Sequence, residues 1–328
     1  MRFTRWAPWL AAVLLAAFPL VAPLLGLDFY IGFVRRAMVF AMAAASLNFI
    51  LGYGGMAALG HAGFVGVGAY TLVALSDAGV QSAWLMWGGA LLVAGAAAGL
   101  IGLIVLRTRG VYLIMSTLAF AQMLYFIAVS LRAYGGDDGY NLMERPLLGF
   151  GLDTLESGAE APFYWAVLLL LGGVMALFNR ATESRFGHAL MGIRDNETRM
   201  RAMGYPVMRL MMAAFMLSGA IAGLAGALLA THNAFVSPSL MHWTQSANLI
   251  VMVVIGGVGL RWGGPVGAAV WIGLEEVFKQ VTDYWHLPLG LLLIAIVFVA
   301  PRGLASLMPR RTAAAAPQPA PAAGGKAA

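Results

Sequence analysis

Long apolar stretches separated by short polar connections follow one another along the chain to about residue 310. A helix needs about 20 apolar residues to cross the roughly 30 Å hydrocarbon layer of a bilayer. On this scale the pattern predicts about ten transmembrane or re-entrant helices, at residues 7–27, 34–51, 60–77, 84–106, 111–131, 162–178, 210–231, 246–260, 265–282 and 287–301. The spans at 60–77 and 246–260 are the weakest, because they are short and rich in glycine. The hydrophobic pattern therefore predicts an all-α polytopic membrane protein.

Glycine interrupts two of these apolar segments, in corresponding halves of the chain. The interrupting glycines are Gly52, Gly54, Gly55, Gly60, Gly63, Gly66 and Gly68 in the first half, and Gly256, Gly257, Gly259, Gly263, Gly264 and Gly267 in the second. Paired interruptions point to a pathway near the membrane midplane, since non-helical backbone at that depth must be buried in protein or line a water-filled cavity. Close helix packing is the alternative, because small residues four apart let helices approach each other. The sequence leaves both interpretations open.

The composition agrees with a membrane protein. Of 328 residues, 61% are hydrophobic and 10% are charged, against about 25% charged in a soluble domain. The formal charge of +6 does not indicate nucleic-acid binding, because the basic residues are dispersed between apolar blocks.

The positions of the basic residues predict the orientation. With the N-terminus in the cytoplasm, all but five of the 20 Lys and Arg residues fall on the cytoplasmic side, as the positive-inside rule requires. The five are Arg35, Arg36, Arg132, Arg145 and Lys279. The adjacent Arg35 and Arg36 break the rule, and the sequence offers no reason for them. We expect a multi-pass membrane protein with both termini in the cytoplasm.

The two ends of the chain are interpreted separately. Arg2 and Arg5 precede an apolar run as in a signal peptide, but Pro19, Pro23 and the lack of a clear small-x-small cleavage site favour a retained first span. Residues 311–328 are rich in Ala and Pro and are expected to form a disordered cytoplasmic tail. This leaves a transmembrane domain at 1–310, with an outer loop at 133–161 and a cytoplasmic loop at 179–209.

The cytoplasmic loop holds a strongly charged stretch, residues 183–210. Burying its eight charged residues in the bilayer would cost on the order of 20 kcal/mol, at roughly 2.5 kcal/mol each, so the stretch must lie in water. Asp195 or Asn196 can cap a short helix that ends at Gly204. This helix, at about 194–204, is either a solvated connector or a docking helix for a groove of a cytosolic partner.

The sequence contains no recognisable enzymatic site. It has no cysteine and no GxxxxGK[ST] phosphate-binding loop, and its five histidines lack a metal-binding spacing. We therefore expect no catalytic residue, no metal and no cofactor. Any ATP hydrolysis must then take place on another subunit.

A few polar side chains within the spans are candidates for a pathway. Each of them is also a candidate for a simple hydrogen bond between helices. Together with the glycines they give the pathway set Asn48, Gly52, Gly55, His61, Gly63, Gln122, Gly256 and Gly257. Glu275 and Glu276 could relay protons in a secondary carrier. Alternatively, Glu275 forms an ion pair with Lys279, four residues further along a helix.

Five blocks of sequence resemble one family, in the family's order and from about residue 35 to residue 307. They are "LNFILGYGGMAALGHAGFVGVGAYT", "RTRGVYLIMSTLAFAQMLYFI", "GGDDGYNL", "SRFGHALMGIRDNETRMRAMGYPVMRLMMAAFMLSGAIAGLAGALLA" and "VMVVIGGVGLRWGGPVGAA" continuing to "VAPRGL". The chain is similar to the LivM-type permeases of branched-chain amino-acid ABC transporters. In that family the cytoplasmic loop carries a degenerate coupling motif that contacts the ATPase. By matched position the coupling residues would be Gly187, Arg194, Glu197, Ala202 and Gly204, whereas Arg201 stands where the family often has an acidic residue.

The resemblance implies a function and its partners. It implies a non-catalytic permease subunit that imports branched-chain or related amino acids. This subunit would pair with a second, LivH-type permease and with two cytosolic ABC ATPase subunits. A periplasmic substrate-binding protein would dock at the outer loop, and membrane lipid would surround the helices. Urea or short amides are alternative substrates within the family, and a proton-coupled secondary carrier is the alternative outside it.

Overall fold

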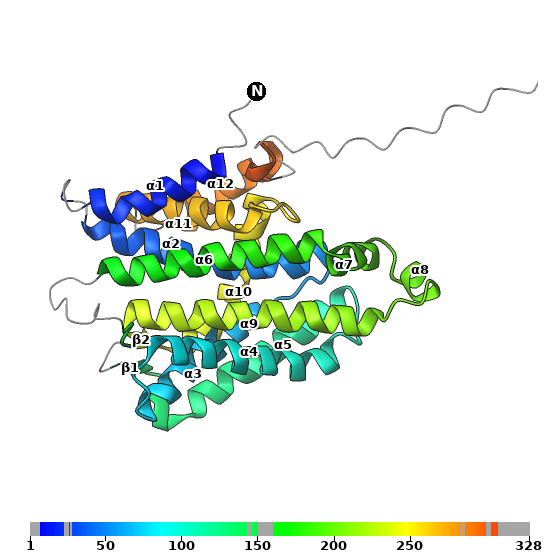
Figure 1. Ribbon diagram of the computed structural model, residues 1–328, viewed down its shortest axis with the longest axis horizontal. Coiled ribbons are helices and arrows are strands. Elements are labelled where there is room, and N and C mark those ends of the chain that lie inside the picture. Colours follow the sequence, from blue (N-terminus) through cyan, green and yellow to red (C-terminus); the bar gives the residue numbers. More distant parts are fainter. Residues whose placement is uncertain are drawn as a thin grey trace, which may run out of the picture.

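The computed structural model describes residues 7–22, 26, 28–142, 146–149, 160–282, 284, 286–299 and 303–307. In these residues the chain folds into a bundle of α-helices, most of which run side by side along its long axis (Figure 1). The helices are α1 (Ala7–Val21), α2 (Asp28–Asn48), α3 (His61–Asp77), α4 (Ala83–Val105), α5 (Val111–Ser130), α6 (Glu160–Glu183), α7 (Arg185–Asp195), α8 (Glu197–Ala202), α9 (Val207–Asn233), α10 (Trp243–Gly256), α11 (Gly263–Val281) and α12 (His286–Val299).

The remaining elements are short. A π-helix, η3 (Phe49–Tyr53), continues α2, and three 3-10 turns are η4 (Arg132–Tyr134), η5 (Pro238–Met241) and η6 (Leu304–Leu307). The strands β1 (Tyr140–Asn141) and β2 (Phe235–Val236) pair antiparallel, with Tyr140 opposite Val236. The all-α prediction is therefore confirmed.

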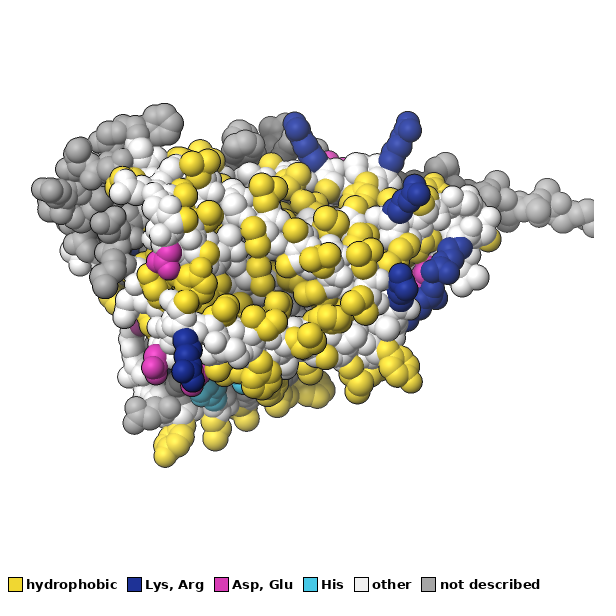
Figure 2. All heavy atoms as spheres, turned by 90° about the horizontal axis from the view of Figure 1, so that it is seen from below, with side chains coloured by type: hydrophobic (Ala, Val, Ile, Leu, Met, Phe, Trp, Pro, Cys, Tyr) yellow, Lys and Arg dark blue, Asp and Glu magenta, His cyan; other side chains and the backbone are white. Residues whose placement is uncertain are grey.

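Each of the ten predicted spans coincides with a helix. The ten are α1 to α6 and α9 to α12. Five segments meet the length and hydropathy of a membrane-crossing helix on their own: Phe29–Tyr53, Ala83–Val105, Val111–Ser130, Pro162–Glu183 and Val207–Asn233. Large apolar side chains cover the sides of the bundle, among them Leu92, Tyr112 and Phe298, which are at least 70% exposed (Figure 2). An apolar surface of this extent suits contact with lipid rather than water.

Helix α9 lies at the centre of the bundle and packs against α2, α3 and α4. A Cβ atom at Gly223 would overlap the side chain of Ala94, and one at Gly226 would overlap the carbonyl of Val65. A Cβ atom at Gly68 would in turn overlap the carbonyl of Gly223. Backbone therefore lies directly on backbone between α3 and α9, which is the close approach that small residues permit in membrane bundles.

The two ends of the bundle differ in charge. Helices α7 and α8 form one end, and the β1–β2 pair lies at the other (Figure 1). Arginine side chains gather at the α7–α8 end (Figure 2), which includes Arg109, Arg194, Arg199, Arg201 and Arg261. Lys and Arg are enriched on the cytoplasmic side of membrane proteins, so this polarity agrees with the predicted orientation.

The opposite end is tied together by a short hydrogen bond. The Tyr140 hydroxyl donates to Asp77 Oδ1 over 2.5 Å, which joins β1 to the last residue of α3. This hydrogen bond is the main cause of the raised pKa of the Tyr140 phenol, because the carboxylate favours its protonated form.

The structure also changes the residue bounds of the predicted loops. Residues 179–183 continue α6 and residues 207–209 open α9, so the connection between these two helices is residues 184–206. The expected helix at 194–204 is wrong in one respect: Arg194 belongs to the preceding helix, α7. Asn196 has φ −161° and ψ 98°, an extended conformation that ends α7 before α8 begins. The predicted tail at 311–328 lies outside the described residues, as do 143–145 and 150–159 of the outer loop.

Candidate coupling and translocation site

We call residues 184–206, with α7 and α8, the hairpin, and its local sequence explains its shape. Ser184 caps α7 by accepting a hydrogen bond from the Gly187 N–H. A Cβ atom at Gly187 would overlap the carbonyls of Ala181 and Thr182, so glycine lets α7 fold back closely on the end of α6. The Asn196 Oδ1 accepts from the Arg199 N–H at 2.8 Å and starts α8, which confirms the predicted cap.

The hairpin packs on the bundle instead of extending freely from it. Leu190 and Ile193 of α7 and Met200 of α8 are at most 6% exposed. An aromatic contact continues inward: Phe186 of α7 stacks on Phe49, with the ring centroids 6.4 Å apart. An α7 displacement would therefore press directly on η3, in which Phe49 lies.

The polar side of α8 contains a three-membered charge group. Glu197 Oε1 lies 2.6 Å from Arg109 Nη2 of the α4–α5 connection and 2.8 Å from Arg201 Nη2. Arg201 is therefore an internal ion-pair partner of Glu197, which explains how a basic residue fits at this position. Beyond Ala202 the chain turns at Gly204, whose φ is +81°, a left-handed value that favours glycine.

The first glycine-interrupted segment, residues 49–60, contains η3 and then leaves helical geometry until α3 starts; we call it the first break. The carbonyl of Gly52 accepts a hydrogen bond from Arg194 Nη1 at 2.6 Å. Asp195 Oδ1 accepts from Nε and Nη2 of the same guanidinium at 3.2 and 3.1 Å. At Gly55, with φ +66°, a Cβ atom would lie 2.6 Å from Arg194 Cγ. The structure thus joins a predicted coupling residue to two predicted pathway residues.

The second glycine-interrupted segment, residues 257–262, connects α10 to α11; we call it the second break. Its φ angles are +111° at Gly257 and +73° at Gly259, which side chains rarely allow. Asn48 spans from the end of α2 to this break: its Oδ1 accepts from the Gly259 N–H and its Nδ2 donates to the Leu260 carbonyl, both at 2.8 Å. A Cβ atom at Gly52 would overlap the backbone of Gly259, so the two breaks are in direct contact.

The other pathway candidates lie along α3, α5 and α10. His61, the first residue of α3, is fully buried, with its Nε2 2.7 Å from Ser46 Oγ and no hydrogen-bond partner for Nδ1 in the described part of the chain. Gly63 faces Ala121 of α5, next to Gln122, whose buried amide nitrogen also lacks a partner there.

Gly256 is a packing residue. A Cβ atom there would overlap the carbonyl of Gly263, so this glycine sets the close contact between α10 and α11.

Sequence reasoning missed two hydroxyl groups at the start of α3. Thr117 Oγ1 accepts from the Leu59 N–H at 3.1 Å, and Ser246 Oγ accepts from the Ala62 N–H at 3.0 Å. The first N–H groups of a helix have no partner within the helix, so a helix that begins inside a bundle needs such acceptors. A buried helix start after a glycine-rich segment is the sequence signal that indicates such hydroxyl acceptors.

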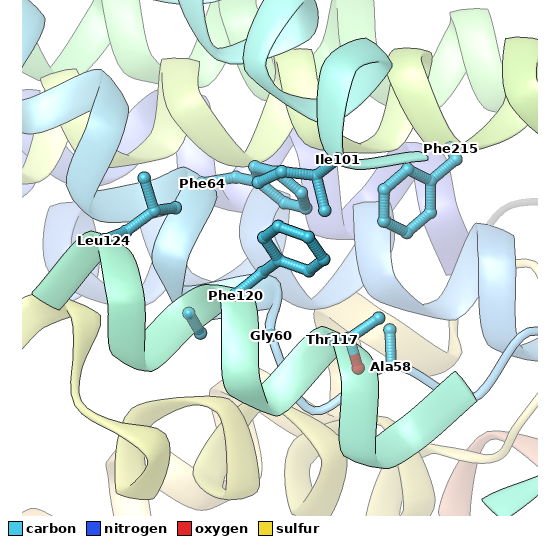
Figure 3. A pocket seen from close by; sticks show the side chains of 9 residues that line it. Ala58, Gly60, Phe64, Ile101, Thr117, Phe120, Leu124 and Phe215 are labelled. Carbon is cyan, nitrogen blue, oxygen red and sulfur yellow. The ribbon is translucent and has the colours of Figure 1, made fainter. Parts of the chain in front are cut away.

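An apolar pocket lies beside this helix start (Figure 3). Gly60 and Thr117 are among the residues that line it. Its walls come from α3, α4, α5 and α9 and include the rings of Phe64, Phe120 and Phe215. None of the lining residues is charged, so this part of the bundle interior is apolar.

The structure also explains the two arginines that break the positive-inside rule. Arg35 is 3% exposed; its Nε donates to His232 Nδ1 at 2.9 Å, and its guanidinium lies 4.8 Å from the ring centroid of Phe163. Arg36 lies 3.4 Å from Glu275. Each is held by partners on other helices, as intramembrane charges require.

Glu275 has a second basic partner. Lys279 Nζ lies 2.5 Å from Glu275 Oε1, which confirms the alternative of a pair four residues apart on one helix. Glu275 is 9% exposed, so the two cations compensate a negative charge that is nearly buried in the bundle.

Comparison with known proteins supports the assignment that the sequence blocks suggested. Residues 29–300 match the family described as branched-chain amino acid transport system / permease component. The chain belongs to this permease family. The match covers helices α2 to α12. It excludes α1 and the residues after 300.

Curated relatives agree with the family. The permease is 31% identical over 289 residues to the high-affinity branched-chain amino acid transport system permease protein LivM of Salmonella typhimurium and to that of Escherichia coli. Each alignment covers 81% of this chain and 68% of the relative. A probable branched-chain amino acid transport permease protein LivM of Methanocaldococcus jannaschii is 27% identical over 162 residues, 43% of this chain and 46% of the relative. No solved structure matches the chain.

Proposed function

We propose that the chain is the transmembrane permease subunit of an ABC importer that carries branched-chain or related amino acids across the bacterial inner membrane. Cytosolic ATPase subunits would dock on the hairpin. The observation that carries this proposal is the combination of the family match with an exposed, charged hairpin that contacts the first glycine break, which is itself joined to the second.

The distribution of charge supports a cytoplasmic hairpin. Arginines are concentrated at its end of the bundle. Six of the ten predicted spans precede the hairpin and four follow it, so spans that all cross the membrane would place both ends of the chain on this side. Both chain termini would then be cytoplasmic. The end with β1 and β2 would face the periplasm and receive the substrate-binding protein.

The tip of the hairpin supports a docking role. Met203 and Tyr205 flank the turn at Gly204 and are 56% and 46% exposed, although the hairpin lies among charged residues. Exposed Met and Tyr side chains on a polar surface are typical anchors for a partner's groove. The chain has no phosphate-binding loop of its own, so an ATPase is the partner that an ABC importer requires here.

Substrate and driving force rest on the relatives and on the lining of the bundle. The relatives are named for branched-chain amino acid transport, and the pocket beside α3 has uncharged, mostly apolar walls. A second permease of the LivH type would complete the pathway. A proton-coupled carrier is less well supported, because Glu275 is engaged by two cations.

A matched pair of substitutions tests the docking role. Tyr205→Asp places a charge at the hairpin tip, and Tyr284→Asp makes the same change at the opposite end, where Tyr284 is 81% exposed. We expect the first to reduce co-purification of the ATPase and uptake of radiolabelled leucine by about tenfold or more, in the range of an interface anchor. The second should leave both near wild type. Retained ATPase and full uptake with Tyr205→Asp would refute the docking site.

Two further measurements test side and energy source. The chain has no cysteine, so Thr198→Cys introduces a single thiol on α8. A membrane-impermeant maleimide should label it from the cytoplasmic side only, and labelling from the periplasm would overturn the topology. Leucine uptake in vesicles should stop without ATP and persist with a protonophore, whereas the opposite result identifies a proton-coupled carrier. Competition by urea or acetamide distinguishes the alternative substrates.

A further inference from the structure

The two breaks are joined by a single side chain. Asn48 ends α2, just before the first break, and its amide satisfies one N–H and one carbonyl of the second break, more than 200 residues further along the chain. The backbones of Gly52 and Gly259 also touch. Neither break can change shape alone without losing these hydrogen bonds or creating an overlap.

The hairpin and the end of α6 each contact this joined unit at one point. Arg194, near the end of α7, donates to the Gly52 carbonyl of the first break. Arg261 of the second break forms an ion pair with Glu183, the last residue of α6, which leads into the hairpin. Helix α7 spans 11 residues, about 16 Å at 1.5 Å per residue, and lies between the Glu183–Arg261 pair, which precedes it, and the Arg194 contact near its end.

The direction of Arg194 matters. Asp195 accepts hydrogen bonds from Nε and Nη2 at one edge of the guanidinium, and Nη1 is thereby directed at the Gly52 carbonyl. The carbonyls in the last turn of a helix have no partner within the helix, and those at the end of η3 depend on donors from elsewhere. A residue that the family resemblance assigns to ATPase contact is thus turned inward, towards the membrane domain.

We propose that Arg194, held by Asp195, and Asn48 are positioning residues that make both glycine breaks move together with α7. A displacement of the hairpin by a docked ATPase then reaches the first break through Arg194 and the second through Asn48. This inference rests on the proposed function, but it assigns to Arg194 a role in transmission within the permease and none in binding the ATPase.

The test separates binding of the ATPase from transmission. The whole transporter is reconstituted in liposomes, and three quantities are measured: ATPase subunits retained, ATP hydrolysed, and leucine imported per ATP. For Arg194→Gln we expect retained ATPase and a ratio of leucine to ATP lower by about tenfold, consistent with the loss of one charged hydrogen bond. Arg194→Lys keeps a charged donor and should restore part of the ratio. Arg185→Gln makes the same change at an exposed position of α7 and should match wild type.

Two more variants guard against simple misfolding. Asp195→Asn leaves the Arg194 side chain in place but weakens its orientation, and we expect a smaller fall of the same ratio. Asn48→Ala should lower the ratio too, and combining it with Arg194→Gln should add little, because both act on one path. Additive losses in the double variant would overturn the shared path.

The remaining outcomes divide between the two proposals. If Arg194→Gln releases the ATPase, Arg194 is a docking residue; the transmission role is overturned while the proposed function stands. An unchanged leucine-to-ATP ratio in Arg194→Gln also overturns it. If the wild-type permease neither retains an ATPase nor depends on ATP, the proposed function itself fails.

Discussion

Replacing Gly52 by alanine tests the contact between the two breaks with a single methyl group. Gly52 lies in η3, and its φ is not in the left-handed region, so alanine can adopt its backbone conformation. The added Cβ atom, however, would overlap the backbone of Gly259 and lie 2.9 Å from Asn48 Oδ1. Backbone cannot rotate away as a flexible side chain can, so the two breaks must separate.

The cost follows from these contacts. Forcing a methyl group into a packed contact costs about 1–3 kcal/mol. Losing the hydrogen bond from the Gly259 N–H to Asn48 adds about 1 kcal/mol. At about 2–4 °C per kcal/mol, the midpoint of this range lowers the unfolding temperature by about 6–12 °C.

The assay is thermal unfolding of the purified permease in detergent, followed by the fluorescence of its nine tryptophans. Gly172→Ala in α6 is the control, because no atom lies within 4 Å of the added Cβ position. That change should keep or slightly raise the midpoint, since alanine favours a helix over glycine by about 1 kcal/mol. Equal midpoints for the two variants, with leucine uptake intact in both, would refute the contact between the breaks.

Three further predictions concern other parts of the bundle. Glu275→Gln leaves two cations without their carboxylate, so we expect a lower unfolding midpoint. Leucine uptake should stay insensitive to a protonophore, and a new proton dependence would contradict the proposed driving force. Gly226→Val should separate α3 from α9 and sharply reduce the monodisperse fraction on size exclusion, whereas Gly172→Val should not. Tyr140→Phe removes the hydrogen bond to Asp77. Because the phenol's pKa is raised above 10.0, that bond stabilises the protein fully below pH 10 and is lost as the pH rises through the raised value. In a pH series of unfolding midpoints, the variant should therefore lack this alkaline loss of stability.

Much of the architecture could be predicted because it depends on local signals. Ten spans follow from the length of apolar stretches, and the cap at Asn196 follows from the side chain's ability to accept a hydrogen bond from the N–H three residues on. The glycine breaks were also visible, since glycine adopts the positive φ angles found at Gly55, Gly257 and Gly259 more readily than other residues.

The connections within the site could not be predicted, because they are not local. Arg194 and Gly52 are 142 residues apart in the chain, and Asn48 and Gly259 are 211 apart. No periodicity or spacing encodes which carbonyl a guanidinium faces across such a distance. For the same reason Arg35 and Arg36 had no explanation in the sequence: their partners lie on α6, α9 and α11.

The pathway candidates show that the same residue type, glycine, can have two structural roles. Glycine at Gly256 keeps α10 and α11 in close contact, while glycine at Gly52 and Gly55 lies where a helix is interrupted and another segment approaches. The residue type is the same, and only the neighbouring backbone distinguishes a packing role from a break. Which of the pathway candidates touches the substrate stays a prediction.

The backbone-to-backbone contacts of α9 restrict the kind of motion available to the permease. Helices slide past one another by small side-chain readjustments at their interface. Where Gly68, Gly223 and Gly226 bring the backbones of α3 and α9 together, there is no side chain to readjust. Helices α3, α4 and α9 should therefore turn as one plate during a transport cycle, with hinges at the segments that flank it. Spin labels placed on α4 and α9 would keep a constant separation in every nucleotide state, whereas the distances from these helices to α7 would change during the cycle.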